Sequence, residues 1–273
     1  MITTRMKTEE ISQEYIKDYT ETLSPRFHNY IEYNEKSIRR IQRMKEIITN
    51  SPQWAKCKGI RRVKTIRNNS YRAILWGSFD GENAAIKSTI YMILNDSITG
   101  KKVVFLFPVD QTSGLVKFSS TFFQEYSKYR QLKLESFEDL VDYFMSTEHS
   151  SGVNITLQDD LNPRYNCKIT FGNNPDMMGF GGVYNDNPQN ESSGNTYFFR
   201  HFSTYDILKK QAEEKGLNSE EINNPLQLFN KLKFSDNERD LELDKALSDK
   251  QKEIEEAWKL YESSKIFGPS ENT

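Results

Sequence analysis

The chain of 273 residues is long enough to bury a substantial core, and it predicts one domain or one domain with a helical extension. Aromatic residues make up 12% and charged residues 28%, a combination that supports packing and excludes a wholly disordered chain. The net charge of −2 conceals two regions of opposite sign. Residues 26–72 carry thirteen Lys and Arg against three Glu, whereas residues 213–256 carry thirteen Asp and Glu against seven Lys and Arg.

Targeting and redox signals are weak. The first ten residues lack the apolar segment of a signal peptide, and the longest apolar run, over residues 103–109, is too short to span a bilayer. Cys57 and Cys167 lie far apart with no Cys or His at ligand spacing, which argues against a disulfide framework and a cysteine-based zinc site. We therefore expect a soluble, cytoplasmic protein that uses no membrane, metal or cofactor.

Two helices are predicted near the N-terminus. Early negative charge and apolar residues at helical spacing predict the first helix over residues 8–19. Ser24 and Pro25 have the order of an N-cap followed by proline at the first helical position, which predicts a second helix over residues 26–49. We expect residues 1–50 to form a helical hairpin that packs on the core.

Alternating apolar residues then replace the helical period. Residues 71–79 and 86–94 have the alternation and the β-branched content of strands, and Asp80-Gly81 between them is a hairpin signal. A third strand is predicted over residues 101–109. The three strands are expected to form an antiparallel meander.

The rest of the predicted core, residues 51–216, mixes helices and strands. Residues 118–130 and 137–145 return to helical spacing, the second after a capping-box sequence that starts at Ser136. Further strands are predicted over residues 153–157, 165–171, 179–184 and 196–202. Glycine-, asparagine- and proline-rich stretches separate them and predict turns or loops.

These elements predict an α+β fold with an antiparallel or mixed sheet of about six or seven strands. We expect one face of the sheet to be covered by the N-terminal helices and by the helix pair over residues 118–146. The glycines of residues 179–182 lack the spacing and the strand-to-helix context of a dinucleotide fingerprint, so they predict a turn or bulge between strands.

The C-terminal part is predicted to be helical. Ser203 or Thr204 has the chemistry of an N-cap for a helix that Gly216 ends. Acidic helices are expected over residues 217–265, followed by a disordered tail over residues 266–273.

Common catalytic signatures are absent from the sequence. It has no P-loop, no nucleophile elbow, no zinc-protease motif and no EF-hand loop, so the nucleotide, serine-hydrolase and zinc-protease chemistry of those motifs is not predicted.

A candidate phosphate site lies where a predicted strand meets a predicted helix. Metal-independent RNA cleavage needs a base for the 2′-hydroxyl proton, a cation at the phosphate and orienting hydroxyl groups. The segment offers these residue types in Arg200, His201, Ser203, Thr204 and Tyr205. The alternative interpretation is a helix N-cap that follows one polar strand residue.

A basic surface is the more specific functional signal. Its candidate contacts to a nucleic-acid backbone are Arg39, Arg40, Arg43, Lys58, Arg61, Arg62, Lys64, Arg67 and Arg72, with aromatic surface from Tyr71 and Trp76 nearby. The alternative is that these cations pair within the chain with the acidic C-terminal helices.

Two functional hypotheses follow. The first is a protein that binds RNA or single-stranded DNA and is a candidate metal-independent ribonuclease. The second is a non-enzymatic adaptor whose acidic C-terminal helices bind a protein partner. The sequence alone leaves both open.

Overall fold

A computed structural model describes residues 1–26, 60–79, 84–107, 114–148, 153–172, 174–185, 195–217 and 224–234. The chain separates into two compact units, Met1–Ile207 and Leu208–Thr273. The predicted second helix, the tail and most of the predicted acidic helices lie outside the described residues, as do Arg39, Arg40, Arg43 and Lys58.

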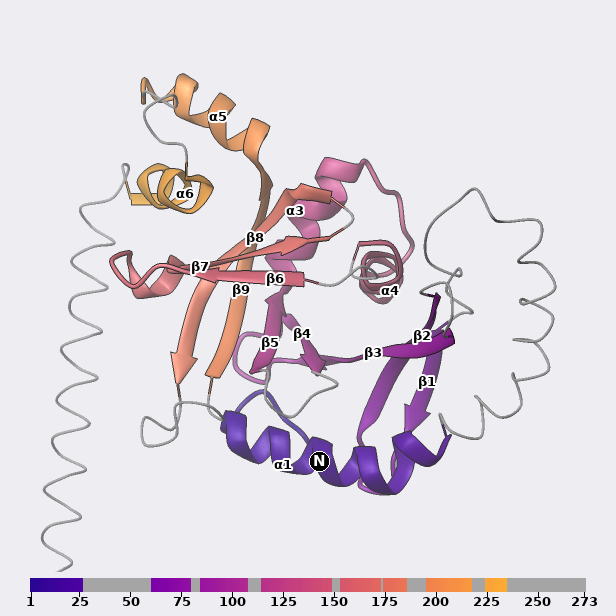
Figure 1. Ribbon diagram of the computed structural model, residues 1–273. Helices are drawn as coiled ribbons and strands as arrows, with labels where there is room; N and C mark the ends of the chain where they lie inside the picture. Colours follow the sequence, from indigo (N-terminus) through magenta and orange to yellow (C-terminus); the bar gives the residue numbers. More distant parts are fainter. Residues whose placement is uncertain are drawn as a thin grey trace, which may run out of the picture. The chain divides into compact units, whose positions relative to one another are not determined.

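The first unit is built on one mixed sheet, to which the described residues contribute nine strands (Figure 1). The strands are β1 (Ile60–Lys64), β2 (Ser70–Phe79), β3 (Ala84–Asn95), β4 (Lys102–Phe107), β5 (Leu115–Ser119), β6 (Val153–Leu157), β7 (Cys167–Phe171), β8 (Asn174–Asn185) and β9 (Asn195–Thr204). Their order is β1-β2-β3-β4-β5-β9-β8-β7-β6. Two antiparallel meanders meet at the centre, where β5 and β9 pair in parallel.

The α+β class is confirmed, but the sheet has more strands than we expected because two short strands carry weak signals. β1 has only two apolar residues beside Arg61, Arg62 and Lys64, which are exposed at the edge of the sheet. β5 has only five residues and runs directly into a helix, so its end was included in the predicted helix over residues 118–130. The predicted meander of β2, β3 and β4 is confirmed.

Several helical segments accompany the sheet. They are α1 (Thr8–Asp18), its π-helical continuation (Tyr19–Leu23), α3 (Ser120–Arg130), α4 (Phe137–Thr147), a 3-10 turn (Pro163–Tyr165), α5 (Tyr205–Glu214) and α6 (Pro225–Phe234). The Ser119 side chain caps α3 by accepting from the Phe122 amide, and Ser136 caps α4 by accepting from the Asp139 amide. None of the described helices combines the length and the apolar character needed to cross a membrane.

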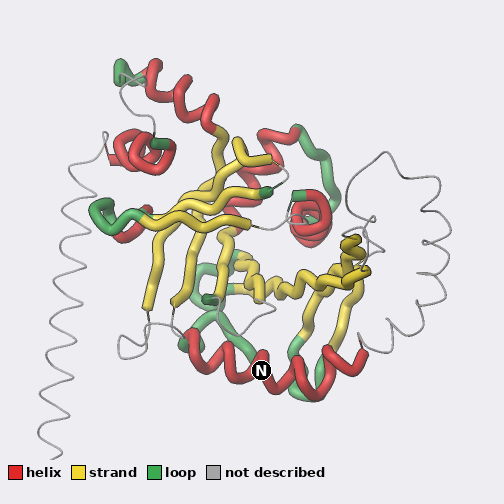
Figure 2. The backbone as a smooth tube through the Cα atoms, in the orientation of Figure 1, coloured by secondary structure: helices red, strands yellow, loops and turns green. Residues whose placement is uncertain are grey.

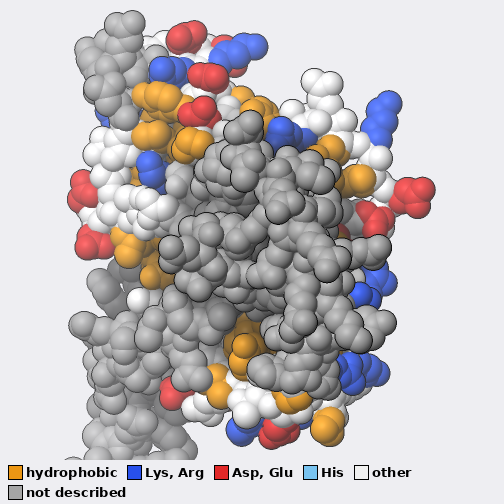
Figure 3. All heavy atoms as spheres, turned by 45° about the vertical axis from the view of Figure 1, so that its right-hand side comes forward, with side chains coloured by type: hydrophobic (Ala, Val, Ile, Leu, Met, Phe, Trp, Pro, Cys, Tyr) orange, Lys and Arg blue, Asp and Glu red, His pale blue; other side chains and the backbone are white. Residues whose placement is uncertain are grey.

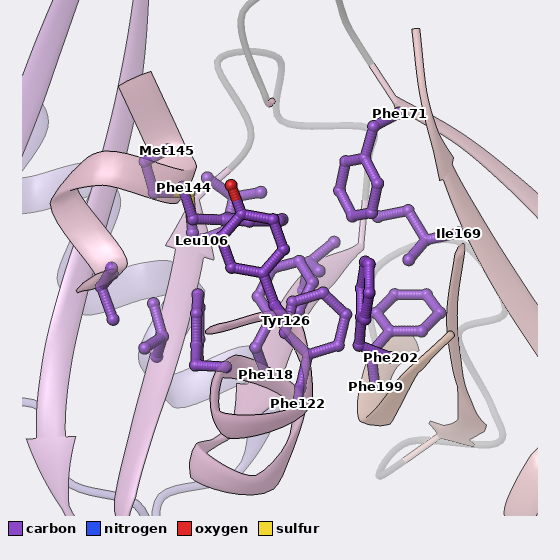
Figure 4. Close-up of a cluster of buried hydrophobic side chains, with 14 of the residues drawn as sticks. Leu106, Phe118, Phe122, Tyr126, Phe144, Met145, Ile169, Phe171, Phe199 and Phe202 are labelled. Carbon is purple, nitrogen blue, oxygen red and sulfur yellow. The ribbon is translucent and has the colours of Figure 1, made fainter. Parts of the chain in front are cut away.

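The larger core lies between the sheet and the helices α3 and α4. Figure 4 shows its aromatic side chains converging from several elements, among them Phe118 of β5, Phe122 of α3 and Phe199 of β9. The Phe118 and Phe122 rings lie 4.9 Å apart, and Phe144 of α4 packs edge-on against Phe122 at 5.4 Å. Such tilted and edge-on pairs favour the negative ring face meeting the positive ring edge.

A second core lies on the opposite face of the sheet, beneath α1. In Figure 2, α1 runs along the lower side of the strands. Ile11 and Tyr15 of α1 pack there with strand residues such as Ala73, Met92 and Phe105. The expectation that the N-terminal helix and the α3–α4 pair cover one face is therefore wrong. Adjacent Ala73 and Ile74 are both fully buried but point to opposite faces, so both faces of this sheet need a cover.

Within the second unit, α5 ends close to the predicted residue. Gly216 follows the helix with a φ of +68°, in the left-handed region that glycine adopts readily. Lys215 donates from Nζ to the Leu232 carbonyl oxygen at 3.1 Å, which ties the end of α5 to α6. The side chains of Ala212 and Leu228 are buried.

Candidate functional site

A β-bulge in β9 places the residues of the candidate phosphate site. Phe180 of β8 is opposite His201, but Gly181 is opposite Phe199, so Arg200 has no partner in the register. The extra residue lets Phe199 and Phe202 both enter the larger core, whereas Arg200 and His201 stay outside it. The glycine-rich segment therefore lies within β8, at the bulge that its composition predicts.

Two of these glycines are required by close packing. A Cβ on Gly181 would stand 1.9 Å from the Phe198 carbonyl oxygen, and a Cβ on Gly182 would stand 2.2 Å from the Pro163 carbonyl oxygen. The second contact keeps the 3-10 turn close against β8. The neighbouring Asn166 side chain also accepts a hydrogen bond from the Val183 amide, at 3.2 Å.

Two side chains, from Ser119 at the end of β5 and from Glu125 in the middle of α3, bond to the backbone of β9 beyond the end of β5. Ser119 Oγ donates to the Arg200 carbonyl oxygen at 2.8 Å, and Glu125 Oε2 accepts from the Phe202 amide at 2.8 Å. These contacts replace the strand hydrogen bonds that β5 would otherwise supply. They fix the backbone on both sides of His201.

His201 lies between a carboxylate and a phenol. Its Nδ1 is 3.0 Å from Glu125 Oε1, and its Nε2 is 3.3 Å from the Tyr165 hydroxyl oxygen. In the neutral ring, an Nδ1–H donated to Glu125 leaves Nε2 as an acceptor for the Tyr165 hydroxyl. The side chain of His201 is 19% exposed and that of Glu125 is 32% exposed, so the pair is reachable from solvent.

Arg200 lies against two aromatic rings. Its guanidinium carbon is 4.6 Å from the centre of the Phe198 ring and 5.2 Å from that of Tyr184. It donates through Nη1 to the Arg164 carbonyl oxygen at 3.1 Å and through Nη2 to the Tyr184 hydroxyl. Stacking of this kind holds the plane of a guanidinium group in one orientation.

We call this group the Arg200 cluster. It consists of Arg164, Tyr165, Tyr184, Phe198, Arg200 and His201, from the 3-10 turn, β8 and β9. Arg164 is exposed and Tyr184 is 38% exposed. The cluster therefore combines two guanidinium groups, aromatic rings and an oriented imidazole at the surface.

The hydroxyl groups of the candidate phosphate site are placed elsewhere. Ser203 and Thr204 are buried. Ser203 Oγ donates to the Thr204 carbonyl oxygen at 3.3 Å, and Thr204 Oγ1 accepts from the Ile207 amide at 3.4 Å as α5 begins at Tyr205. The Thr204 contact is that of a helix N-cap, and both hydroxyls bond to nearby backbone. The structure therefore brings together Arg200 and His201 but not the two hydroxyls.

Sequence reasoning missed five members of the site: Glu125, Arg164, Tyr165, Tyr184 and Phe198. Glu125 is 76 residues from His201 along the chain, and no spacing rule connects them. A search for aromatic residues opposite arginine on neighbouring strands would have required the register and the bulge.

The basic residues of the second candidate site fall into two described groups. Arg61, Arg62 and Lys64 are exposed on β1, and Figure 3 shows Lys and Arg side chains along the right-hand margin of its view. Arg67 instead donates two hydrogen bonds of 2.7 Å to Glu21, and Arg72 pairs with Asp142 of α4. Hydrogen bonding to Arg67 holds the pKa of Glu21 below its usual value.

Tyr71 does not contribute the aromatic surface that we expected. Its side chain is 1% exposed and donates from its hydroxyl to Asp18 Oδ2 at 3.0 Å. Burial, reinforced by the nearby Asp18 carboxylate, raises the pKa of the phenol above its ordinary value. The side chain of Trp76 lies outside the described residues.

The described ranges contain no candidate metal centre. There, no three His, Cys, Asp or Glu side chains are grouped so that they could hold a metal ion.

Searches against known protein families, curated proteins and solved structures find no match to this chain.

Proposed function

We propose that this protein binds single-stranded nucleic acid, RNA or DNA, at the Arg200 cluster. The observation that carries the proposal is the Arg200 guanidinium, held by the rings of Phe198 and Tyr184 beside the exposed Arg164. Guanidinium groups bind phosphate through paired N–H donors, and exposed aromatic faces stack on bases without sequence preference.

The electrostatic part of the proposal uses the outer strand β1. Arg61, Arg62 and Lys64 are exposed there and would neutralise backbone phosphates. Arg67 and Arg72 are assigned a structural role because each is held by carboxylates of the first unit. Contacts from Arg39, Arg40, Arg43 and Lys58 remain predictions.

The candidate ribonuclease reaction follows from the orientation of His201. With RNA bound, the Tyr165 hydroxyl would turn from Nε2 to the 5′-oxygen, which frees the one lone pair of Nε2. With Glu125 on Nδ1, Nε2 would then take the 2′-hydroxyl proton as the 2′-oxygen attacks the adjacent phosphorus. A 2′,3′-cyclic phosphate forms, and the bond from phosphorus to the 5′-oxygen breaks. Tyr165 would protonate that oxygen and regain a proton from His201 across their hydrogen bond, while Arg200 stabilises the phosphate charge.

The test is binding of labelled single-stranded RNA and DNA across a salt series, with each RNA mixture also run on a denaturing gel in the presence of chelator. Arg200→Ala should weaken binding roughly tenfold. It removes a phosphate contact, and it removes the guanidinium that packs against the rings of Phe198 and Tyr184. Lys101→Ala removes an exposed cation that belongs neither to the Arg200 cluster nor to β1, and it should leave binding nearly unchanged. Equal binding by both variants and the parent protein would contradict the proposed site.

The gel separates binding from cleavage. His201→Ala should abolish chelator-resistant cleavage while the RNA stays bound, and Glu125→Gln should reduce it by weakening the orientation of the imidazole. Binding without any cleavage by the parent protein would retain the binding proposal and reject the ribonuclease reaction. Absence of binding at low salt would reject both and favour the adaptor hypothesis.

A further inference from the structure

Among the strands of the described residues, the two outermost, β1 and β6, have opposite character. β1 carries three cations, Arg61, Arg62 and Lys64, and such charges protect an edge strand from pairing with another chain. β6, with the sequence Val-Asn-Ile-Thr-Leu, has no charge and no proline, and three of its five residues are β-branched. Figure 1 shows β6 beside β7 at the other end of the strand order.

The backbone of β6 has a defined inner and outer side. The Gln158 amide donates to the Asn166 carbonyl oxygen at 2.8 Å, and this pair continues the register that sets Leu157 opposite Cys167. Hydrogen-bonded pairs alternate with non-bonded pairs in an antiparallel ladder. Asn154 and Thr156 therefore exchange hydrogen bonds with β7, whereas the N–H and C=O groups of the odd-numbered residues point away from it.

The side chains of β6 divide in the same way. Val153, Ile155 and Leu157 project to one face, on which Ile155 packs against the larger core. Val153 is 36% exposed and Leu157 is 44% exposed, so the two ends of this apolar row are not covered. Asn154 and Thr156 are exposed on the other face.

We propose that β6 pairs antiparallel with β6 of a second copy of this chain, about a two-fold axis through Ile155. In this register Val153 faces the partner's Leu157, and Asn154 faces the partner's Thr156. Apolar residues thus meet apolar residues on one face, and polar residues meet polar residues on the other. The three outward-pointing residues of each strand form the hydrogen-bonded pairs, with about six backbone hydrogen bonds in all.

The same antiparallel self-pairing is unfavourable for β1, so the proposal applies to β6 and not to β1. Self-pairing of β1 about its central residue would set Arg62 directly against the partner's Arg62, and like charges at opposed positions destabilise a strand pair. A dimer through β6 instead satisfies the backbone of the uncharged edge and joins two sheets into one.

Sedimentation equilibrium of the full chain tests this dimer. The weight-average mass should rise with concentration from 32.0 kDa toward twice that value. A mass that stays at the monomer value up to the solubility limit would overturn the proposal.

Two double variants test the register. Val153→Lys with Leu157→Lys sets lysine against lysine across the axis and should hold the protein monomeric at every concentration. Val153→Lys with Leu157→Glu sets lysine against glutamate at both ends and should restore the dimer. A dimer that persists in the first variant, or fails to return in the second, would show that the copies meet at another surface.

A fold control accompanies both variants. The substituted side chains are partly exposed, so circular dichroism and thermal unfolding should match the parent protein. The dimer proposal does not rest on the nucleic-acid proposal, because no residue of β6 belongs to the Arg200 cluster. If both double variants unfold, Thr156→Lys, which brings the two lysines close to the axis on the other face, should raise the dissociation constant at least about tenfold.

Discussion

At the scale of single residues, Gly181 decides whether the bulge can form. In Gly181→Ala the new Cβ would collide with the backbone of Phe198, which cannot move away as a flexible side chain could. We expect a loss of about 3 kcal/mol in the free energy of unfolding, measured by chemical denaturation.

Gly100 provides the matched control. It has a φ of +67° and no atom within 4 Å of a new Cβ, so Gly100→Ala should cost only about 1 kcal/mol of backbone strain. Equal losses in the two variants would mean that the strand relaxes around the new methyl group and that the bulge does not depend on glycine.

The residue scale also marks a limit of sequence reasoning. Arg200 and His201 were selected from their residue types, and the structure does place them side by side at the surface of β9. Ser203 and Thr204 were selected on the same grounds but are buried and bonded to nearby backbone. Residue type cannot separate a hydroxyl that caps a helix from one that faces a ligand.

At the scale of elements, Ser119 connects α3 to β9. Ser119→Ala removes the N-cap of α3 and the hydrogen bond to the Arg200 carbonyl oxygen, which should cost about 2 kcal/mol. Ser136→Ala removes a helix cap and an exposed hydrogen bond to the Asp139 carboxylate at the start of α4, and it should cost about 1 kcal/mol.

The difference between these two serine variants measures the contact between helix and strand. The two variants should be compared by urea unfolding, with one common slope for the dependence of the unfolding free energy on urea concentration. A loss for Ser119→Ala no larger than that for Ser136→Ala would mean that the hydrogen bond to Arg200 contributes nothing to stability. The sequence predicted the cap at Ser136 because a cap is a local arrangement.

At the scale of the whole molecule, the reactivity of the Cys167 thiol measures how often the larger core opens to solvent. Its side chain is fully buried in the larger core, and burial raises the pKa of the thiol to about 12. The thiolate is the reactive form, so folded protein at about pH 8 holds almost no reactive species at this position.

Labelling of Cys167 should therefore require opening of the core. In Cys57→Ser, which leaves Cys167 as the single thiol, reaction with a disulfide reagent should be at least about a thousandfold slower in the folded protein than in urea. Labelling of the folded protein within minutes would show that β7 is exposed by local opening well below the global free energy of unfolding.

The arrangement of layers could not be read from the sequence. Ala73 and Ile74 alternate as in any strand, and their alternation does not state which helix covers which face. The covering of both faces depends on the positions of α1, α3 and α4, which are set by packing between distant segments.

The sequence by itself determined the local features of this protein. It predicted the strands β2, β3 and β4, the caps at Ser136 and Gly216, the break in regularity at residues 179–182 and the α+β class, because periodicity, capping and backbone freedom are properties of neighbouring residues.

Only the tertiary structure decided which residues meet. The parallel pairing of β5 with β9 brings Ser119 beside Arg200, and Glu125 then reaches His201 across 76 residues of sequence. It also decided that Arg67 and Arg72 are held by carboxylates while Arg61 and Arg62 stay exposed on an edge strand. The physical reason is that register, bulge position and ion pairing depend on the free energy of contacts between distant segments, which no local pattern encodes.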